Sequence, residues 1–210
     1  MTTTTTNDVA TESPTDVPTD VVLDEGQAVA TLVMAFSADP VVRWLYPEPA
    51  RYLAFFPQLA RLLGGDAFAA GTAEVARGHA GTALWVSPDS HLDEEAAAAL
   101  VERSVDEVRV EAVFALFTEV LGLHPTEPVW YLPFIGVDPA HQGRGIGGRL
   151  LAAGLARADR DGLPAYLEAS TPRNRALYER HGFEVLAEVR AAGSPPLWPM
   201  MRPARGGSGR

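Results

Sequence analysis

The segment HQGRGIGGRL, residues 141–150, is the part of the chain in which residue types and spacing point most directly to chemistry. The apolar run WYLPFIGV (130–137) precedes it, and an amphipathic pattern typical of a helix follows it. Glycine lets the backbone turn tightly and lets a ligand approach, and the unpaired N–H groups of a helix N-terminus attract anions. We therefore expect a phosphate-binding loop between a strand and a helix, formed around Gly143, Gly145, Gly147 and Gly148.

Three anion-binding patterns compete for this loop. The P-loop requires Lys and then Ser or Thr after its last glycine, but Arg149 and Leu150 follow Gly148. The dinucleotide pattern G-x-G-x-x-G matches formally, and Glu168 stands about 20 residues further on. However, DPAHQ (138–142) separates these glycines from the strand, and the remaining chain is too short for the rest of a doubly wound sheet. The third pattern, Q-x-x-G-x-G, matches at 142–147 with Gln142, Gly145 and Gly147 as its defining positions.

A second motif lies about 30 residues downstream, in STPRNRALYERHGFE (170–184), with Asn174, Tyr178 and a Gly-Phe pair that opens the next predicted strand. In this order the two motifs resemble the acetyl-CoA-binding segments of the GNAT superfamily of N-acetyltransferases. The sequences of residues 82–90, 127–145 and 164–183 are similar to those of the group of actinobacterial enzymes that includes puromycin N-acetyltransferase. The resemblance implies the GNAT fold, an α/β (α+β) domain with a central mixed and strongly twisted sheet flanked by helices. A helical insertion at about 92–122 would precede the central strand.

The resemblance also implies acetyl-CoA as cosubstrate, without a metal. The strand before the loop would pair with the pantetheine arm, the loop would bind the pyrophosphate, and Asn174 would hydrogen-bond the arm. Tyr178 would protonate the CoA sulfur, and a phenol with a pKa of about 10 can protonate a thiolate whose conjugate pKa is about 8.5. The implied cofactor-binding residues are Ile135, Gly136, Val137, Gln142, Gly143, Arg144, Gly145, Ile146, Gly147, Gly148, Asn174 and Tyr178.

The group that takes the proton of the incoming amine is less clearly defined. Many superfamily members place a glutamate on the strand before the loop, but WYLPFIGV has none. Glu168 is the natural substitute, although a buried glutamate that accepts backbone N–H groups would show the same pattern. His124 is a second candidate for proton relay, and water can serve if the amine arrives partly neutral. Trp85 and Tyr131 are the predicted walls of the acceptor pocket.

Hydrophobic periodicity and the positions of glycine and proline predict the elements that hold these residues. A bulge is expected at Pro133 because a central strand disfavours proline. One domain is predicted over 19–203, between a disordered tail at 1–18 and a flexible tail at 204–210. We expect helices at 24–37, 50–64, 93–103, 104–121, 150–161 and 171–181, and strands at 72–77, 80–86, 130–137, 165–170, 183–189 and 197–201.

Composition argues against several other classes of protein. The formal net charge of −10 opposes binding to nucleic acids, whose phosphates require a basic surface. The absence of cysteine excludes disulfides, zinc–thiolate sites and a cysteine nucleophile. The N-terminus lacks the pattern of a secretory signal, and no stretch approaches the roughly 18–20 apolar residues of a membrane span. We expect a cytoplasmic protein without membrane contact, present as a monomer or a homodimer.

The sequence as a whole predicts an acetyl-CoA-dependent acyltransferase that acts on a primary amine of a small molecule, such as an antibiotic or another natural product. A protein lysine or N-terminal acetyltransferase is one alternative, and it would present an open groove in place of a pocket roofed by the helices at 93–121. A non-catalytic acyl-CoA-binding sensor is another. The presence of Tyr178 speaks against the sensor, because a sensor needs no donor of a proton to a thiolate.

Overall fold

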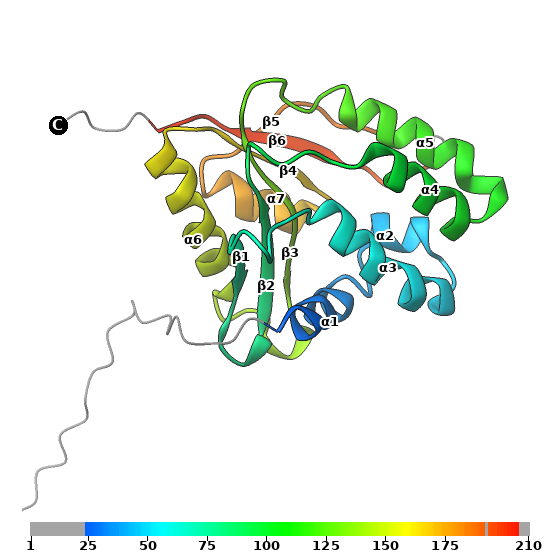
Figure 1. Ribbon diagram of the computed structural model, residues 1–210, viewed down its shortest axis with the longest axis horizontal. Coiled ribbons are helices and arrows are strands. Elements are labelled where there is room, and N and C mark those ends of the chain that lie inside the picture. The colour runs from blue at the N-terminus through cyan, green and yellow to red at the C-terminus, as the bar shows by residue number, and fades with distance from the viewer. Residues whose placement is uncertain (1–23, 192, 206–210) are drawn as a thin grey trace, which may run out of the picture.

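A single mixed sheet of six strands, with helices on both faces, is built by residues 24–191 and 193–205, which the computed structural model describes (Figure 1). The strand order is β1-β2-β3-β4-β6-β5; β3 and β4 run parallel, and the other neighbouring pairs run antiparallel. This architecture agrees with the predicted fold class. The predicted tail at 1–18 and the last five residues of the predicted tail at 204–210 lie outside the described residues.

Three helices form the N-terminal part. α1 (Glu25–Ala35) is capped by Asp24, whose side chain accepts a hydrogen bond from the Gln27 amide. α3 (Pro49–Leu63) agrees with the helix predicted at 50–64. Between them lies the short helix α2 (Pro40–Leu45), which was not predicted. Asp39 and Pro40 end the first predicted helix, as expected, but they also serve as N-cap and first residue of α2.

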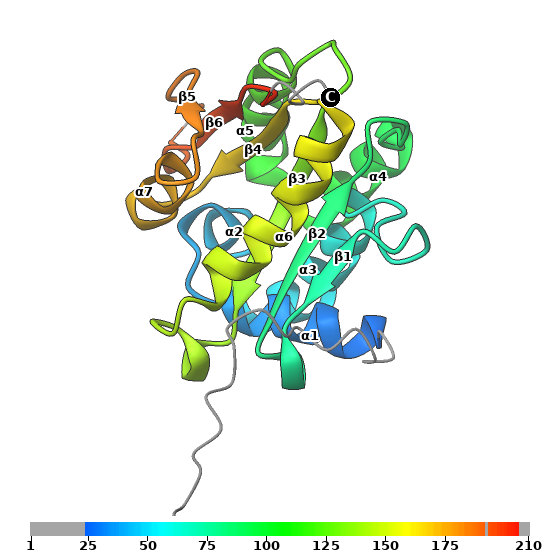
Figure 2. The ribbon, with the colours of Figure 1, turned by 90° about the vertical axis from the view of Figure 1, so that its left-hand side faces the viewer.

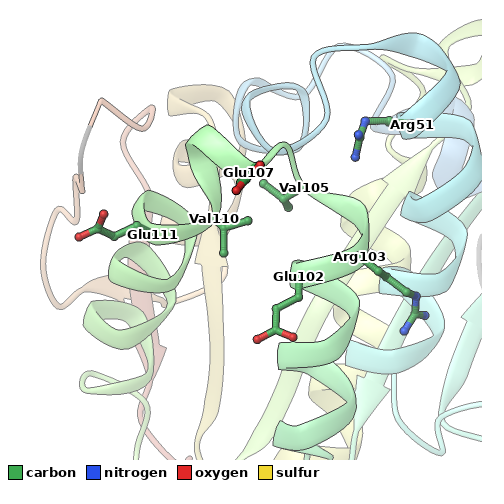
Figure 3. A pocket seen from close by; sticks show the side chains of 7 residues that line it. All are labelled: Arg51, Glu102, Arg103, Val105, Glu107, Val110 and Glu111. Atoms are coloured by element: carbon green, nitrogen blue, oxygen red, sulfur yellow. The ribbon is translucent and has the colours of Figure 1, made fainter.

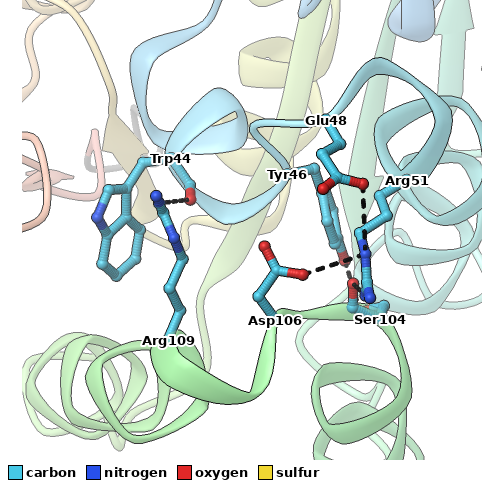
Figure 4. Close-up of polar contacts among 7 residues, drawn as sticks. All are labelled: Trp44, Tyr46, Glu48, Arg51, Ser104, Asp106 and Arg109. Atoms are coloured by element: carbon cyan, nitrogen blue, oxygen red, sulfur yellow. Dashed lines mark hydrogen bonds and ion pairs between the residues drawn. The ribbon is translucent and has the colours of Figure 1, made fainter.

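The predicted helical insertion is present as α4 (Glu94–Ser104) and α5 (Glu107–Leu121), which follow strands β1 (Ala73–Val75) and β2 (Gly81–Val86). The junction of α4 and α5 is tied to the end of α2 and the start of α3 (Figure 4). The Arg51 guanidinium donates to the Ser104 carbonyl at 2.8 Å, and Arg109 donates to the Trp44 carbonyl at 2.8 Å. The buried hydroxyls of Tyr46 and Ser104 lie 3.1 Å apart. These contacts fix the position of α2.

Strand β3 (Trp130–Val137) is irregular at its proline, as predicted. Leu84 of β2 opposes Phe134, and Val86 opposes Tyr131, so β3 carries one more residue than β2 between these pairs. The extra residue changes the face to which the side chains point: Leu132 packs in the core beside α6, whereas Phe134 packs in the core on the opposite face. The strand packs against a core on each face, as predicted, although the side chains at alternate positions are only half-buried.

The second half of the chain follows the predicted order. Strand β4 (Ala165–Ala169) and strand β6 (Trp198–Arg202) agree with the predictions, and helix α6 (Ile146–Asp161) starts four residues earlier than the predicted 150. Helix α7 (Pro172–Glu179) ends before the predicted 181. Strand β5 (Glu184–Val185) has only two residues, and the rest of the predicted strand at 183–189 contributes one isolated bridge between Val189 and Leu197.

The two faces of the sheet carry separate cores. Figure 2 shows the helices that cover each face. α6 and α7 cover one face, and α1 to α5 cover the other. Gly136 of β3 shows how closely α1 approaches the second face, since a Cβ atom placed there would lie 2.6 Å from the Cβ of Ala35. None of the described helices has the length and apolarity that a membrane span requires.

Candidate active site

The sheet opens between its two parallel strands. Three residue pairs join β3 to β4, and the last is Leu132 with Leu167. Beyond that pair, β4 continues beside β6 through Glu168 and Ala169, whereas the rest of β3 pairs only with β2 in the described part of the chain. The edge of β3 around residues 135–137 therefore offers N–H and C=O groups to an extended ligand, as an edge strand does.

A cavity of about 420 Å³ occupies this opening. Its walls come from the junction of α1 and α2, from β3, from the glycine loop and from α7. All of the predicted cofactor-binding residues line it except Arg144. The fold therefore brings together, in one cavity, two motifs that the sequence places about 30 residues apart.

The glycine loop has the geometry of an anion site. A short 3₁₀ turn, Pro139–His141, follows β3, and Gly143 (φ +77°) and Gly145 (φ +73°) then adopt left-handed backbone conformations. No side chain caps the N-terminus of α6, which leaves the amides of its first turn directed at the cavity. Gly147 and Gly148 lie inside this first turn. Gly143 thus needs the same left-handed backbone conformation as Gly145, although only Gly145 is a defining position of the pattern Q-x-x-G-x-G.

The side chain of Gln142 braces the loop. Its amide nitrogen donates to the Val137 carbonyl at 3.2 Å, and its oxygen accepts a hydrogen bond from Arg173 at 3.3 Å. Gln142 therefore holds the loop against the end of β3. Arg144 is exposed and does not line the cavity, whereas Arg173 and Arg180 line it. These cations give the site a locally positive rim in an acidic chain.

Helix α7 presents Asn174 and Tyr178 to the same cavity. The hydroxyl of Thr171 accepts a hydrogen bond from the Asn174 amide at 3.1 Å, and Pro172 occupies the first helical position, as predicted. Tyr178 is 4% exposed, and burial raises its pKa, as do the nearby carboxylates of Asp39 and Glu168. The Tyr178 hydroxyl therefore stays protonated at neutral pH, the state that a proton donor requires.

Glu168 lies on the opposite face of the sheet, in a cluster of aromatic side chains. The Tyr131 hydroxyl donates to its Oε2 atom at 3.0 Å, and the His124 ring meets the rings of Tyr131 and Tyr166 edge-on, with centroids 5.2 Å and 4.7 Å away. Burial raises the pKa of Glu168 to about 7, although the hydrogen bond from Tyr131 acts in the opposite direction. A carboxylate with this pKa is suited to accept a proton near neutrality.

The structure does not support Trp85 as a wall of the acceptor pocket. Trp85 is fully buried beneath α6, and a Cβ atom at Gly154 would lie 1.9 Å from its Nε1 atom. Its neighbour Leu84 faces the opposite core, because side chains alternate along a strand. Tyr131 does lie on the face opposite α6, where it contacts Glu168; its part in acceptor binding stays a prediction.

Sequence reasoning missed Asp39, which lines the cavity and is 8% exposed. Its Oδ1 atom accepts hydrogen bonds from the Val41 and Val42 amides at 3.0 Å and 3.1 Å, and its Oδ2 atom accepts one from the Ser170 hydroxyl at 2.5 Å. The available signal was the Asp-Pro pair, which marks a helix start as well as a helix end.

A second hollow, of about 620 Å³, lies at the junction of α4 and α5. Figure 3 shows its lining of mixed charge. None of the predicted site residues lines it, so it does not compete with the first cavity for the motifs. Within the described ranges, no group of three His, Cys, Asp or Glu residues is arranged to hold a metal ion. The lining residues of this hollow are Arg51, Glu102, Arg103, Val105, Glu107, Val110 and Glu111.

Comparison with known proteins agrees with this geometry. Residues 87–183 match the acetyltransferase (GNAT) family. An uncharacterised N-acetyltransferase of Schizosaccharomyces pombe is 27% identical, over 76% of this chain and 70% of its own. A solved structure described as histone acetyltransferase HPA2 and related acetyltransferase, from Corynebacterium glutamicum, is 26% identical with a TM-score of 0.62, over 89% of this chain and 94% of its own. The polyamine N-acetyltransferase of Drosophila melanogaster, which forms N-acetylagmatine, shares the fold at 16% identity and a TM-score of 0.56, over 85% and 94%.

The sheet order and these likenesses define the class of the protein: the chain has the GNAT fold. It is an acyltransferase of the GNAT N-acetyltransferase type, a class whose general cosubstrate is acetyl-CoA.

Proposed function

We propose that this protein transfers the acetyl group of acetyl-CoA to a primary amine of a small molecule, by direct attack of the amine while both substrates are bound. One observation carries the proposal. A single cavity joins the uncapped N-terminus of α6, the open edge of β3 and the phenol of Tyr178. These are an anion site, an edge for an extended chain and a proton donor.

The residues present fit coenzyme A. The first-turn amides of α6 and the loop glycines bind the pyrophosphate, whose negative charge the helix N-terminus favours. Arg173 and Arg180 add positive charge to the same cavity. The edge of β3 at residues 135–137 pairs with the pantetheine arm, and Asn174 hydrogen-bonds it.

Acetyl-CoA supplies a thioester. The chain supplies a proton acceptor, a proton donor and a backbone N–H that polarises the thioester. Glu168 accepts the proton of the amine at its carboxylate, and its pKa of about 7 leaves enough carboxylate at neutral pH. Tyr178 donates its hydroxyl proton to the departing sulfur. A backbone N–H of β3 polarises the thioester oxygen, as in an oxyanion hole.

Two likenesses favour a small molecule over a protein substrate. The contacts of Arg51 and Arg109 fasten α4 and α5 to α2 and α3 (Figure 4), but these two helices do not line the cavity and so do not bear on this choice. The resemblance to the puromycin N-acetyltransferase group favours an antibiotic or natural-product amine. An enzyme of the same fold from Drosophila is named for polyamine substrates.

The test is to incubate the protein with acetyl-CoA and a panel of acceptors while measuring thiol release and product mass. The panel contains alkylamines, polyamines, aminonucleoside antibiotics and lysine-containing histone peptides. We expect release with a small amine and none with the peptides. Release with peptides alone would favour a protein acetyltransferase. Measurable CoA binding without release with any acceptor would overturn the catalytic proposal and leave a sensor.

A further inference from the structure

Asp39 has a carboxylate in the wall of the cavity and no assigned role in the reaction. It is nearly buried, and it faces the same space as Tyr178 and Gly136. Asp39 and Ser170 are 131 positions apart in the chain, so the hydrogen bond between them joins the start of α2 to the end of β4. The carboxylate thus stands where the two sides of the open sheet meet.

The hydrogen bonds of Asp39 hold its carboxylate in place without neutralising it. Three donors contact it: the Val41 and Val42 amides on Oδ1 and the Ser170 hydroxyl on Oδ2. A carboxylate has about four lone-pair sites, so about one site is left for a further donor. None of the ion pairs among residues 24–191 and 193–205 includes Asp39, so no Arg or His of this part of the chain pairs with it. A nearly buried carboxylate without a cation is costly, and a cationic ligand would remove that cost.

We propose that Asp39 binds the ammonium group of the acceptor and thereby selects amines that arrive as cations. This inference rests on the proposed function and adds a substrate class to it. Asp39 holds the acceptor in this scheme, and Glu168 receives its proton.

The surroundings of Asp39 support this division of roles. The Asp39 charge raises the pKa of Tyr178 more than the Glu168 charge does, which places Asp39 in the field of the proton donor. An ammonium bound to Asp39 offsets that effect and makes Tyr178 a better acid when the acceptor is present. The contact between Tyr46 and Ser104 and the Arg109 bond to Trp44 hold α2, so the carboxylate is preorganised for its ligand (Figure 4).

Asp39 is also the N-cap of α2, and the experiment must separate capping from binding. Asn and Ser are both good N-caps and both are neutral. Asp39→Asn and Asp39→Ser therefore keep the cap and remove the charge. Asp93→Asn is the matched control, because Asp93 caps α4 through a hydrogen bond from the Ala96 amide and lies on the surface.

Two acceptors are compared at pH 7.5, an alkylamine that is cationic and an arylamine that is neutral. For the alkylamine we expect either Asp39 variant to raise KM about 10- to 100-fold, the value of a hydrogen bond to a charged group, with kcat within about threefold. The KM of the arylamine and the Kd of acetyl-CoA change less than about threefold, and Asp93→Asn changes nothing. Calorimetry of alkylamine binding to the CoA-saturated protein gives the same comparison without turnover.

Equal KM changes for the two amines, or none, would overturn the inference. So would a fall in kcat at constant KM, since Asp39 would then act in the chemistry and not in docking. If the wild type binds the alkylamine through Asp39 in calorimetry but never acetylates any amine, the docking inference stands and the proposed function fails. If it acetylates amines with no dependence on Asp39, the proposed function stands and the docking inference fails.

Discussion

The two walls of the open sheet are built in different ways. What we propose as the cofactor wall consists of the β3 edge at 135–137, the loop at 142–148 and helix α7, and it presents the uncapped first-turn amides of α6 to the cavity. What we propose as the acceptor wall consists of Asp39, which lines the same cavity, and the cluster of His124, Tyr131 and Glu168, which does not line it. Side-chain contacts between distant segments hold both. The first wall offers hydrogen-bond donors that every residue carries, and the second offers titratable groups that only a few residue types supply.

In the proposed function, this difference assigns cofactor binding to backbone groups and selectivity for the amine to side chains. Backbone amides bind a phosphate whatever the neighbouring side chains are, so the cofactor wall tolerates changes at the surface of its loop. The acceptor wall depends on buried carboxylates whose protonation and position follow from their partners. Substitutions in the cofactor wall should therefore change acetyl-CoA binding, whereas substitutions of the buried carboxylates should change the amine kinetics and their pH dependence.

The largest expected effect is on stability, and it comes from substitution of a residue that is buried behind the cofactor wall. Trp85→Ala removes a fully buried indole beneath α6, and we expect a loss of about 3–5 kcal/mol in the free energy of unfolding. The KM of the amine should stay unchanged in the folded fraction, since Trp85 faces away from the acceptor wall. Denaturant unfolding and steady-state kinetics below the unfolding transition measure the two quantities.

Val108→Ala is the control for Trp85→Ala, because Val108 is 90% exposed on α5 and its truncation should cost at most about 0.5 kcal/mol. If fully folded Trp85→Ala shows a raised KM for the amine, Trp85 contributes to the acceptor pocket after all. The assignment of cofactor and acceptor binding to separate faces of the sheet would then be wrong.

Tyr178→Phe tests the point where the two walls meet. The phenylalanine ring keeps the packing against Phe183, so the loss is confined to the hydroxyl proton. We expect kcat to fall about 100- to 1000-fold, within the range of a positioned general acid, while the Kd of acetyl-CoA stays within about twofold. Single-turnover kinetics and calorimetry check this, and an unchanged kcat would remove Tyr178 from the proton chemistry.

Glu168→Gln should lower kcat/KM about 10- to 100-fold at pH 7.5 and flatten its pH profile. In the wild type the rate rises with pH through the Glu168 pKa of about 7, because the base must be ionised. The sign for stability is the opposite. The folded-state pKa lies above the ordinary 4.5, so the stabilisation is present below about 4.5 and is lost as pH rises through about 7.

The glutamine variant should lack both pH dependences, in kcat/KM and in the unfolding midpoint. Glu184→Gln, at an exposed position of β5, is the matched control and should keep both. Retention of the wild-type pH profile in Glu168→Gln would show that another group, or water, takes the proton.

The sequence predicted the local structure of the glycine loop and of α7 closely, because these motifs are local; cofactor binding by these residues stays a prediction. The glycine spacing, the Thr171-Pro172 cap and the interval from Asn174 to Tyr178 each lie within one turn or one loop. The six residues of α2 are too few to show a helical period, so that helix was missed. The length of β5 likewise depends on its pairing with β6, which the hydrophobic pattern of residues 183–189 does not reveal.

The acceptor wall could not be read from the sequence for a different reason. The Asp39–Ser170 contact joins positions 131 residues apart, and no periodicity encodes such a pairing. Trp85 was misplaced because GTALWV gives an alternation but not the identity of the helix that covers each face. Glu168 was singled out because a lone carboxylate in an apolar strand is a local signal, and its role as base stays a prediction. Its hydrogen-bond partner Tyr131 comes from another strand, and His124 contacts that tyrosine from a third segment.

The smallest expected effect concerns the one predicted cofactor residue that lies outside the cavity. Arg144 is exposed, so Arg144→Ala should weaken acetyl-CoA binding at most about fivefold, and less as salt is raised. Gly145→Ala is the matched change in the same loop: it forces a left-handed conformation (φ +73°) on a residue with a Cβ, at a cost of about 1–2 kcal/mol. Calorimetry with acetyl-CoA compares the two variants. If Arg144→Ala weakens binding more than Gly145→Ala, the cofactor wall depends on side-chain charge and not on backbone geometry, and the contrast between the two walls fails.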